Sequence, residues 1–328
     1  MEKLRVSLFG RFSVECRNQV LDEFNGNKFI ELFCYLLLYR NRPHHRETLV
    51  NLFWEDVPIK RSRACLRKAL WQLRSMLDAH TKLEDYQIIL VDSDWVQINT
   101  EANFWLDIDV FEQAYNHVQG IPGWELDPAS IQNLDSAVEH YKGDLLEGLY
   151  QDWCLYERER FKHMYLIMLD KLMDYYEAHN DYEAALTYGL CNLRYDQARE
   201  RTHRRLMRLY YLTGDRTKAL RQYDRCMEIL NQELGVKPAK RTLALYERIR
   251  ADQPIVSRPK TTNTAFGPPA VHSLDGSLDK LKKLQTELFT IQSQIRQEVE
   301  SIEILLSNLH KRPATQPIDQ PLHDDYTY

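Results

Sequence analysis

The alternation of apolar and polar residues near the amino terminus predicts a small β-sheet. Two short alternating runs, residues 4–8 and 12–16, are separated by a turn at Gly10 and followed by an apolar pair at 20–21. Alternation of this kind places every second side chain on one face of a strand. We therefore expect a small antiparallel sheet at the start of the chain.

The pattern then changes to apolar residues three and four positions apart, which is typical of helices with one buried face. It predicts a helix from Lys28 that stops near residues 41–43, a second over 46–54 and a third over 60–77. Two β-branched runs follow, at 88–91 and 95–98, and indicate a hairpin. A sheet, three helices and a hairpin, in that order, predict a winged helix-turn-helix with an extra amino-terminal sheet.

From Trp105 to about Arg250 the pattern is almost wholly helical, and it contains an internal repeat. The segment 180–186 recurs as 214–220, so that corresponding residues lie 34 positions apart. A period of this length, with a small alanine where two helices meet, is the signature of tetratricopeptide repeats. We expect two repeat units with a flanking helix on each side.

The last part of the chain divides into three segments of different composition. Residues 251–276 are rich in Pro, Thr, Ser and Asn, which predicts a flexible linker. Residues 277–310 carry apolar residues at alternating spacings of three and four, which predicts a coiled-coil helix. We expect that helix to form a homodimer or higher oligomer, or to dock on the chain's own helical domain, and residues 311–328 to be a disordered tail.

Composition and charge limit the classes of protein to consider. The chain has 328 residues, 43 basic against 48 acidic, a net charge of −5 and a pI near 6.1, so any nucleic-acid surface must be local. The six cysteines are dispersed without a paired spacing, and no stretch is apolar enough to span a membrane. These features predict a soluble cytoplasmic protein that needs neither a metal nor another cofactor.

A local basic surface lies on the third predicted helix. Between Val57 and Leu77 there are six basic residues and no acidic one. Leucines occupy one face of this helix, and the cations lie opposite or along one flank, which suits insertion into the major groove of DNA. We expect base contacts from Arg61, Arg67, Lys68 and Trp71, phosphate contacts from Arg63 and Arg74, and weaker phosphate contacts from Lys28 and Arg46.

Two groups of motifs resemble one known family. The first group is similar to the DNA-binding domain of the Streptomyces antibiotic regulatory protein family and comprises residues 28–43, 46–49, 52–54 and 63–74. The second group resembles the bacterial transcriptional activation domain that follows it and comprises residues 104–111, 141–148, 153, 157–160 and 233–238. The resemblance covers residues 4 to about 250.

The resemblance implies a mainly α protein with an OmpR-type winged helix at residues 1–105 and a tetratricopeptide-like activation domain at 106–250. It implies a bacterial transcription regulator, commonly an activator, that binds promoter DNA and contacts RNA polymerase, through a loop at 55–58 if the OmpR pattern holds. The hairpin tip departs from that pattern, because Asp92-Ser93-Asp94 would repel a phosphate.

Other functional classes receive less support from the sequence. The main alternative is a protein-interaction adaptor, in which the tetratricopeptide-like domain binds a peptide and the winged domain binds no DNA. The second repeat unit is distinctly basic, which suits an acidic partner, a phosphorylated ligand, DNA, or a solvated face paired internally. An enzyme is not expected, because no nucleophile, metal set or phosphate-binding loop has the required spacing, and the adjacent His44 and His45 lack the one-face spacing of a metal site.

Overall fold

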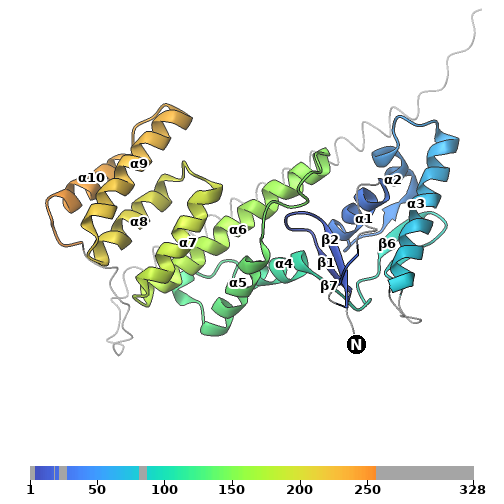
Figure 1. Ribbon diagram of the computed structural model, residues 1–328, viewed down its shortest axis with the longest axis horizontal. Coiled ribbons are helices and arrows are strands. Elements are labelled where there is room, and N and C mark those ends of the chain that lie inside the picture. Colours follow the sequence, from blue (N-terminus) through green and yellow to red (C-terminus); the bar gives the residue numbers. More distant parts are fainter. Residues whose placement is uncertain (1–3, 18, 22–27, 81–86, 256–328) are drawn as a thin grey trace, which may run out of the picture. The chain divides into compact units, whose positions relative to one another are not determined.

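The computed structural model describes residues 4–17, 19–21, 28–80 and 87–255, and these are mainly helical (Figure 1). All of the described residues belong to one compact unit. The predicted coiled coil and tail, and the linker beyond residue 255, lie outside the described residues. The expectation of a mainly α fold is confirmed.

The amino-terminal sheet combines three neighbouring segments with a distant one. Its strands are β1 (Leu4–Ser7), β2 (Ser13–Cys16), β3 (Gln19–Val20) and β7 (Phe104–Leu106), in the order β3-β2-β1-β7. β1 pairs with β2 antiparallel and with β7 parallel, with Leu4 opposite Phe104. The predicted sheet is present, and β7 is an addition that the sequence pattern did not indicate.

Three helices and a second sheet follow, and the helices and two of the three strands lie where the sequence pattern predicts. The helices are α1 (Lys28–Leu38), α2 (Arg46–Phe53) and α3 (Ile59–His80). The second sheet has the order β4-β6-β5, with β4 (His44–His45), β5 (Ile89–Val91) and β6 (Trp95–Ile98). β5 and β6 form the predicted hairpin, and β4 ties the start of α2 to it by pairing His45 with Trp95.

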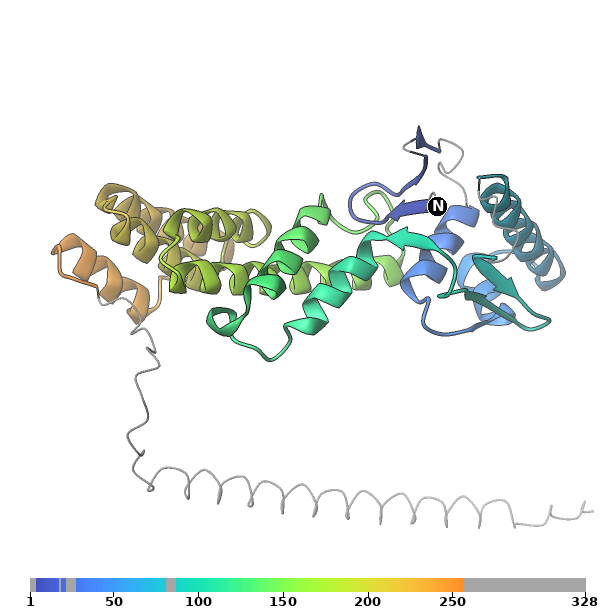
Figure 2. The same ribbon diagram turned by 90° about the horizontal axis from the view of Figure 1, so that it is seen from below.

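The rest of the described chain is built from helices. They are α4 (Asp107–His117), the 3-10 helix η1 (Gly123–Glu125), α5 (Pro128–His140), α6 (Asp152–Ala178), α7 (Tyr182–Tyr195), α8 (Glu200–Leu212), α9 (Arg216–Leu234) and α10 (Lys240–Arg250). From α6 to α10, each helix packs on the next (Figure 2).

The 34-residue repeat is visible in the bonds between helices. Asp181 caps α7 by accepting a hydrogen bond from the N–H of Ala184 (3.1 Å), and Asp215 caps α9 in the same way with Lys218 (2.9 Å). The preceding residues, Asn180 and Gly214, both have a positive φ, 61° and 83°. Each cap is thus preceded by the same left-handed turn, which lets the chain reverse between helices.

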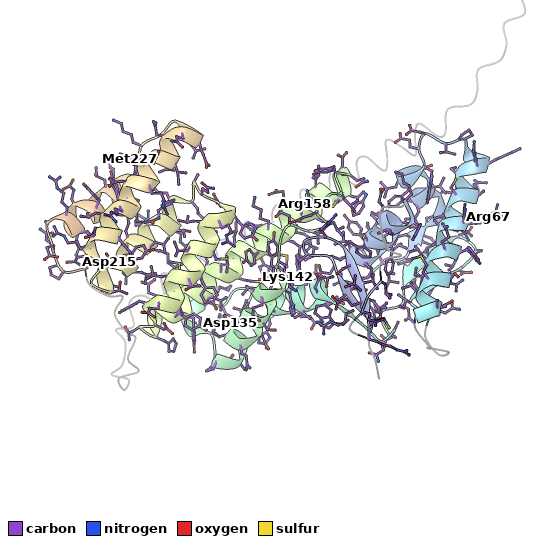
Figure 3. The ribbon with its side chains drawn as sticks, viewed as in Figure 1. Arg67, Asp135, Lys142, Arg158, Asp215 and Met227 are labelled. Carbon is purple, nitrogen blue, oxygen red and sulfur yellow. The ribbon has the colours of Figure 1, made fainter. Side chains whose placement is uncertain are left out.

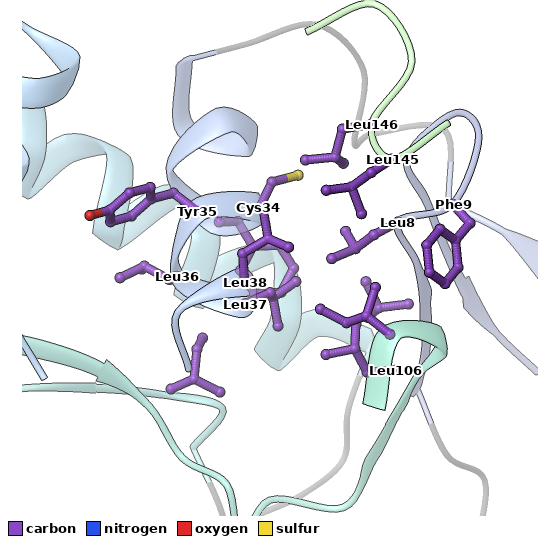
Figure 4. Packing of buried hydrophobic residues seen from close by; sticks show 14 of the residues in the cluster. Leu8, Phe9, Cys34, Tyr35, Leu36, Leu37, Leu38, Leu106, Leu145 and Leu146 are labelled. Carbon is purple, nitrogen blue, oxygen red and sulfur yellow. The ribbon is translucent and has the colours of Figure 1, made fainter. Parts of the chain in front are cut away.

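One hydrophobic core extends across the predicted boundary at 105/106. It joins residues of β1, α1 and α3 to residues of α4, α5 and α6, as far as Leu172. Figure 4 shows Leu8 and Cys34 beside Leu106, Leu145 and Leu146. The amino-terminal elements and the first helices of the following domain therefore bury their apolar surfaces against each other.

Candidate nucleic-acid interface

The third helix, α3, has one buried and one exposed face. Leu66, Leu70, Leu73 and Leu77 are almost completely buried, as the sequence pattern predicts. Because these leucines recur at spacings of four, three and four, they fix the rotation of the helix and turn the other positions outward. The exposed face includes Arg61, Ala64, Arg67, Lys68 and Trp71.

Three cations of this face are free to meet a ligand. Arg61, Arg67 and Lys68 are exposed, and none of them has an ion-pair partner among the residues that the structure describes. Arg67 lies on the outer side of α3 (Figure 3). Trp71, one turn beyond Arg67, is 68% exposed, which is unusual for a side chain of that size. The four predicted base-contacting residues thus lie on one accessible face.

The other four predicted contacts are engaged within the protein. The Nε of Arg63 lies 2.8 Å from Oε1 of Glu47, and the Nζ of Lys28 lies 3.6 Å from a carboxylate oxygen of Glu31. Arg74 donates a hydrogen bond to the side-chain oxygen of Gln87, just before the hairpin. Arg46 donates to the hairpin tip.

The hairpin tip is held against the start of α2 by Arg46. The guanidinium of Arg46 donates hydrogen bonds to the carbonyl oxygens of Asp92 (3.3 Å) and Ser93 (3.4 Å). The backbone N–H of Arg46 donates to the carbonyl oxygen of Asp94 (2.9 Å). His45 caps α2 through Nδ1, which accepts from the N–H of Glu47 at 3.3 Å. The tip is therefore fixed beside α2.

A groove lies between the start of α2, α3 and the hairpin tip. Its volume is about 640 Å³, and it contains four cations and two carboxylates. The lining residues are His45, Arg46, Glu47, Val50, Lys60, Arg63, Leu66, Arg67, Ser93 and Asp94. The sequence indicated the cations, but Glu47 was missed because its partner Arg63 lies on another helix.

Three arginines of the second repeat unit form ion pairs within the protein. Arg205 lies 2.7 Å from a carboxylate oxygen of Asp174, Arg199 2.6 Å from one of Asp170, and Arg208 3.1 Å from one of Glu177. These three carboxylates come from α6, so the ion pairs bind α8 to α6. Of the interpretations left open by the sequence, this geometry favours a structural role for the arginines on α8.

Comparison with known proteins identifies the helical domain. The family model of the bacterial transcriptional activator domain matches residues 106–250. This part of the chain matches a bacterial transcriptional activator domain. The match confirms the resemblance to the bacterial transcriptional activation domain that the sequence motifs indicated. The helices α4–α10 lie within the matched residues, and we refer to residues 106–250 as the activator domain.

Two relatives of this chain are transcriptional regulatory proteins. The chain is 25% identical over 232 residues to the transcriptional regulatory protein MoaR1 of Mycobacterium tuberculosis, covering 67% of this chain and 71% of MoaR1. It is 24% identical over 243 residues to EmbR of the same organism, covering 71% of this chain and 60% of EmbR.

A solved structure has a similar fold. The structure of Mycobacterium tuberculosis EmbR in complex with a low-affinity phosphopeptide matches with a TM-score of 0.61 and 20% identity, covering 78% of this chain and 67% of that chain. Among the residues of this chain that the structure describes, no helix is long and apolar enough to cross a membrane.

Proposed function

We propose that this protein is a sequence-specific DNA-binding transcription regulator, and an activator, that reads duplex DNA with α3. The observation that carries the proposal is the exposed face of α3, where Arg61, Arg67 and Lys68 lack acidic partners and Trp71 projects into solvent. A helix of this kind, placed before a hairpin, has the form of the reading helix of an OmpR-type winged helix.

The contacts divide into two kinds. Arg67 and Lys68 can donate to guanine edges and Trp71 can contact a thymine methyl group, which would specify sequence. Arg63, Arg74, Arg46 and Lys28 can contact phosphates, which would fix the position of the protein on the duplex. DNA binding at α3 also requires Arg63 and Arg74 to exchange their present partners for phosphates.

The activator domain supplies the second half of the proposed function. Its relatives are transcription regulators, which supports a role in signal input, oligomerisation or RNA polymerase contact. The loop at 55–58 is the proposed polymerase-facing segment, and residues 277–310 are the proposed dimerisation helix. The cytoplasmic, nucleoid-associated location expected from the sequence belongs to the same proposal.

Substitution of two exposed cations on α3 tests the proposal. The variant Arg67→Ala with Lys68→Ala removes two charges from the face that would enter the groove, without touching the buried leucines. We expect its affinity for duplex DNA to fall about tenfold or more, because each lost base contact costs about 1–3 kcal/mol. We also expect the slope of log affinity against log salt to decrease, because two cations leave the field of the phosphates. Fluorescence anisotropy on the full chain over a salt series measures both.

A charge-matched control separates a local effect from a general one. The pair Lys142→Ala and Lys237→Ala removes the same charge from exposed positions of the activator domain, and we expect it to bind as the wild type does. If the α3 variant keeps the wild-type affinity and salt slope, α3 is not the reading helix. A full chain that binds no duplex at any salt concentration would instead favour the protein-interaction adaptor.

A further inference from the structure

The groove beside α3 carries its own negative charges. Glu47, at the second position of α2, and Asp94, at the hairpin tip, line the same surface as Lys60 and Arg67. These carboxylates lie where a DNA backbone would have to approach, if α3 enters a major groove. A phosphate placed there would meet repulsion from them as well as attraction from the cations.

The ion pair between Glu47 and Arg63 has the properties of an exchangeable contact. Its two atoms lie 2.8 Å apart, but the side chains are 42% and 59% exposed, respectively. Exposed pairs of this kind contribute little to stability, because water and salt screen them. Another anion can therefore replace Glu47 at Arg63 without disturbing the fold.

The partner exchange is helped by the geometry of the guanidinium. Glu47 contacts Arg63 through Nε, and the Arg63 side chain is 59% exposed. A phosphate accepts two parallel hydrogen bonds from a guanidinium, and such bidentate contacts are stronger than a single charged hydrogen bond. A phosphate can therefore compete for Arg63 on favourable terms.

The hairpin tip cannot move aside easily when a ligand arrives. Arg46 holds the tip through the carbonyl oxygens of Asp92 and Ser93, and β4 pairs with β6 directly next to it. The negative charge of Asp94 therefore stays at the groove. Glu47 differs, since among the described residues its carboxylate is held by the side chain of Arg63 alone.

We propose that Glu47 is an affinity-setting residue that competes with a DNA phosphate for Arg63. The inference rests on the proposed DNA-binding function and adds to it an internal competitor built into the interface. In the free protein Glu47 neutralises Arg63, so a loosely placed duplex gains nothing from that cation. A duplex that fits the reading helix brings a phosphate close enough to displace the carboxylate. A duplex that fits poorly does not, so the competition weakens its binding.

The variant Glu47→Gln tests the competition directly. It keeps the size of the side chain and removes the charge, so Arg63 becomes available to a phosphate. On a fluorescein-labelled mixed-sequence duplex of about three helical turns, we expect the affinity of the full chain to rise about threefold to tenfold, and the salt slope to increase by about 0.9, the value of one added phosphate contact.

A double-mutant cycle shows whether the effect passes through Arg63. In the background of Arg63→Ala, Glu47→Gln should raise affinity and salt slope much less than in the wild type, because the contested cation is gone and only the direct repulsion between Glu47 and the phosphate is relieved. The matched control is Glu101→Gln, which removes one exposed carboxylate outside the groove and should bind as the wild type does. Thermal unfolding of each variant verifies that the fold is kept.

The possible results separate the inference from the function on which it rests. Lower affinity in Glu47→Gln would mean that Glu47 positions Arg63 for DNA, and would overturn the competition. An equal gain in the presence and absence of Arg63, or no gain at all, would also overturn it. If the α3 variant Arg67→Ala with Lys68→Ala still loses affinity in the same assay, DNA binding by α3 stands even when the inference fails.

Discussion

A single buried carboxylate joins the amino-terminal sheet to the activator domain. Asp107, at the start of α4, accepts hydrogen bonds from the backbone N–H groups of Leu8 (2.7 Å), Phe9 (2.9 Å) and Ile108 (2.8 Å). Burial raises the pKa of the Asp107 carboxyl to about 6, against the opposing effect of these N–H donors. Its protonation therefore differs between the folded and the unfolded chain.

Replacement of Asp107 by alanine should destabilise the protein. The substitution leaves up to three buried N–H groups without an acceptor, and each such loss costs about 1–3 kcal/mol. We expect the free energy of unfolding at pH 7 to fall by at least about 2 kcal/mol. Urea denaturation of the wild type and the variant, followed by circular dichroism, measures this difference. A change of less than a few tenths of a kcal/mol would contradict the role of Asp107 as an acceptor.

The same variant should also change the pH dependence of stability. The unfolded carboxyl titrates near pH 4, while the folded one titrates near 6, so the folded state binds the additional proton between these values. The stability that this carboxyl contributes to the wild type is therefore greatest below about pH 4, and it is lost as the pH rises through about 6. We expect the deficit of Asp107→Ala to be larger at pH 5 than at pH 7.5. An equal deficit at both values would contradict a raised pKa.

At the residue scale, the sequence predicted whether a side chain is buried or exposed wherever this follows from the spacing of residues within one helix. The buried leucines of α3 and its exposed cations follow from spacing alone. The Glu47–Arg63 pair, the Arg46 contacts and the Asp107 bonds join segments far apart in sequence. No local pattern encodes such a pairing, so these contacts could not be predicted. Which bases or phosphates the α3 residues touch stays a prediction.

The elements with the strongest periodicity were also those predicted best. The first three helices and the hairpin lie where the apolar spacing indicates, with ends that differ by a few residues. The strands β4 and β7 were missed because they have two and three residues, too few to show alternation. They exist because a distant strand offers its edge, as β1 does to β7.

The repeated caps of α7 and α9 give a prediction at the scale of the element. Asp181→Ala removes the acceptor for the N–H of Ala184 at the first turn of α7. Loss of such a cap costs about 1 kcal/mol, and we expect the free energy of unfolding to fall by that amount. Glu183→Ala, which removes an exposed carboxylate in the same turn without a cap bond, is the matched control. Equal losses in both variants would mean that helix charge, not capping, is responsible.

At the scale of the whole molecule, the core shared by β1, α1, α4 and α6 decides what can fold alone. Leu8, Phe9 and Leu106 pack against Leu145 and Phe161 of the activator domain. Three backbone hydrogen bonds add to this contact, among them Gly10 N–H to the carbonyl of Asp144 at 2.8 Å. Both domains were indicated by the sequence, but the extent of the surface that they share was not.

A truncated chain tests this dependence. We expect residues 1–109 alone to lack a cooperative thermal transition, because large side chains that are worth about 1.5–3 kcal/mol each when buried would be exposed. Residues 1–255 keep the whole described core and should unfold cooperatively. Circular dichroism melting of the two fragments makes the comparison, and a sharp transition in the shorter one would contradict the shared core.

The shared core also determines at which residues the chain could be joined to a segment of a related protein. Replacement of residues 1–105 by the corresponding part of another protein would separate side chains that pack together, and both parts would then have mismatched cores. The turns at 180/181 and 214/215 differ from residue 105, because both have the same backbone hydrogen bond. The N–H of Asp181 donates to the carbonyl oxygen of Tyr176 at 2.9 Å, and the N–H of Asp215 donates to that of Tyr210 at 2.8 Å. Duplication or loss of one 34-residue unit at these joints would keep the turn and the cap that both joints share, so the length of the helical domain can change without any change to α3.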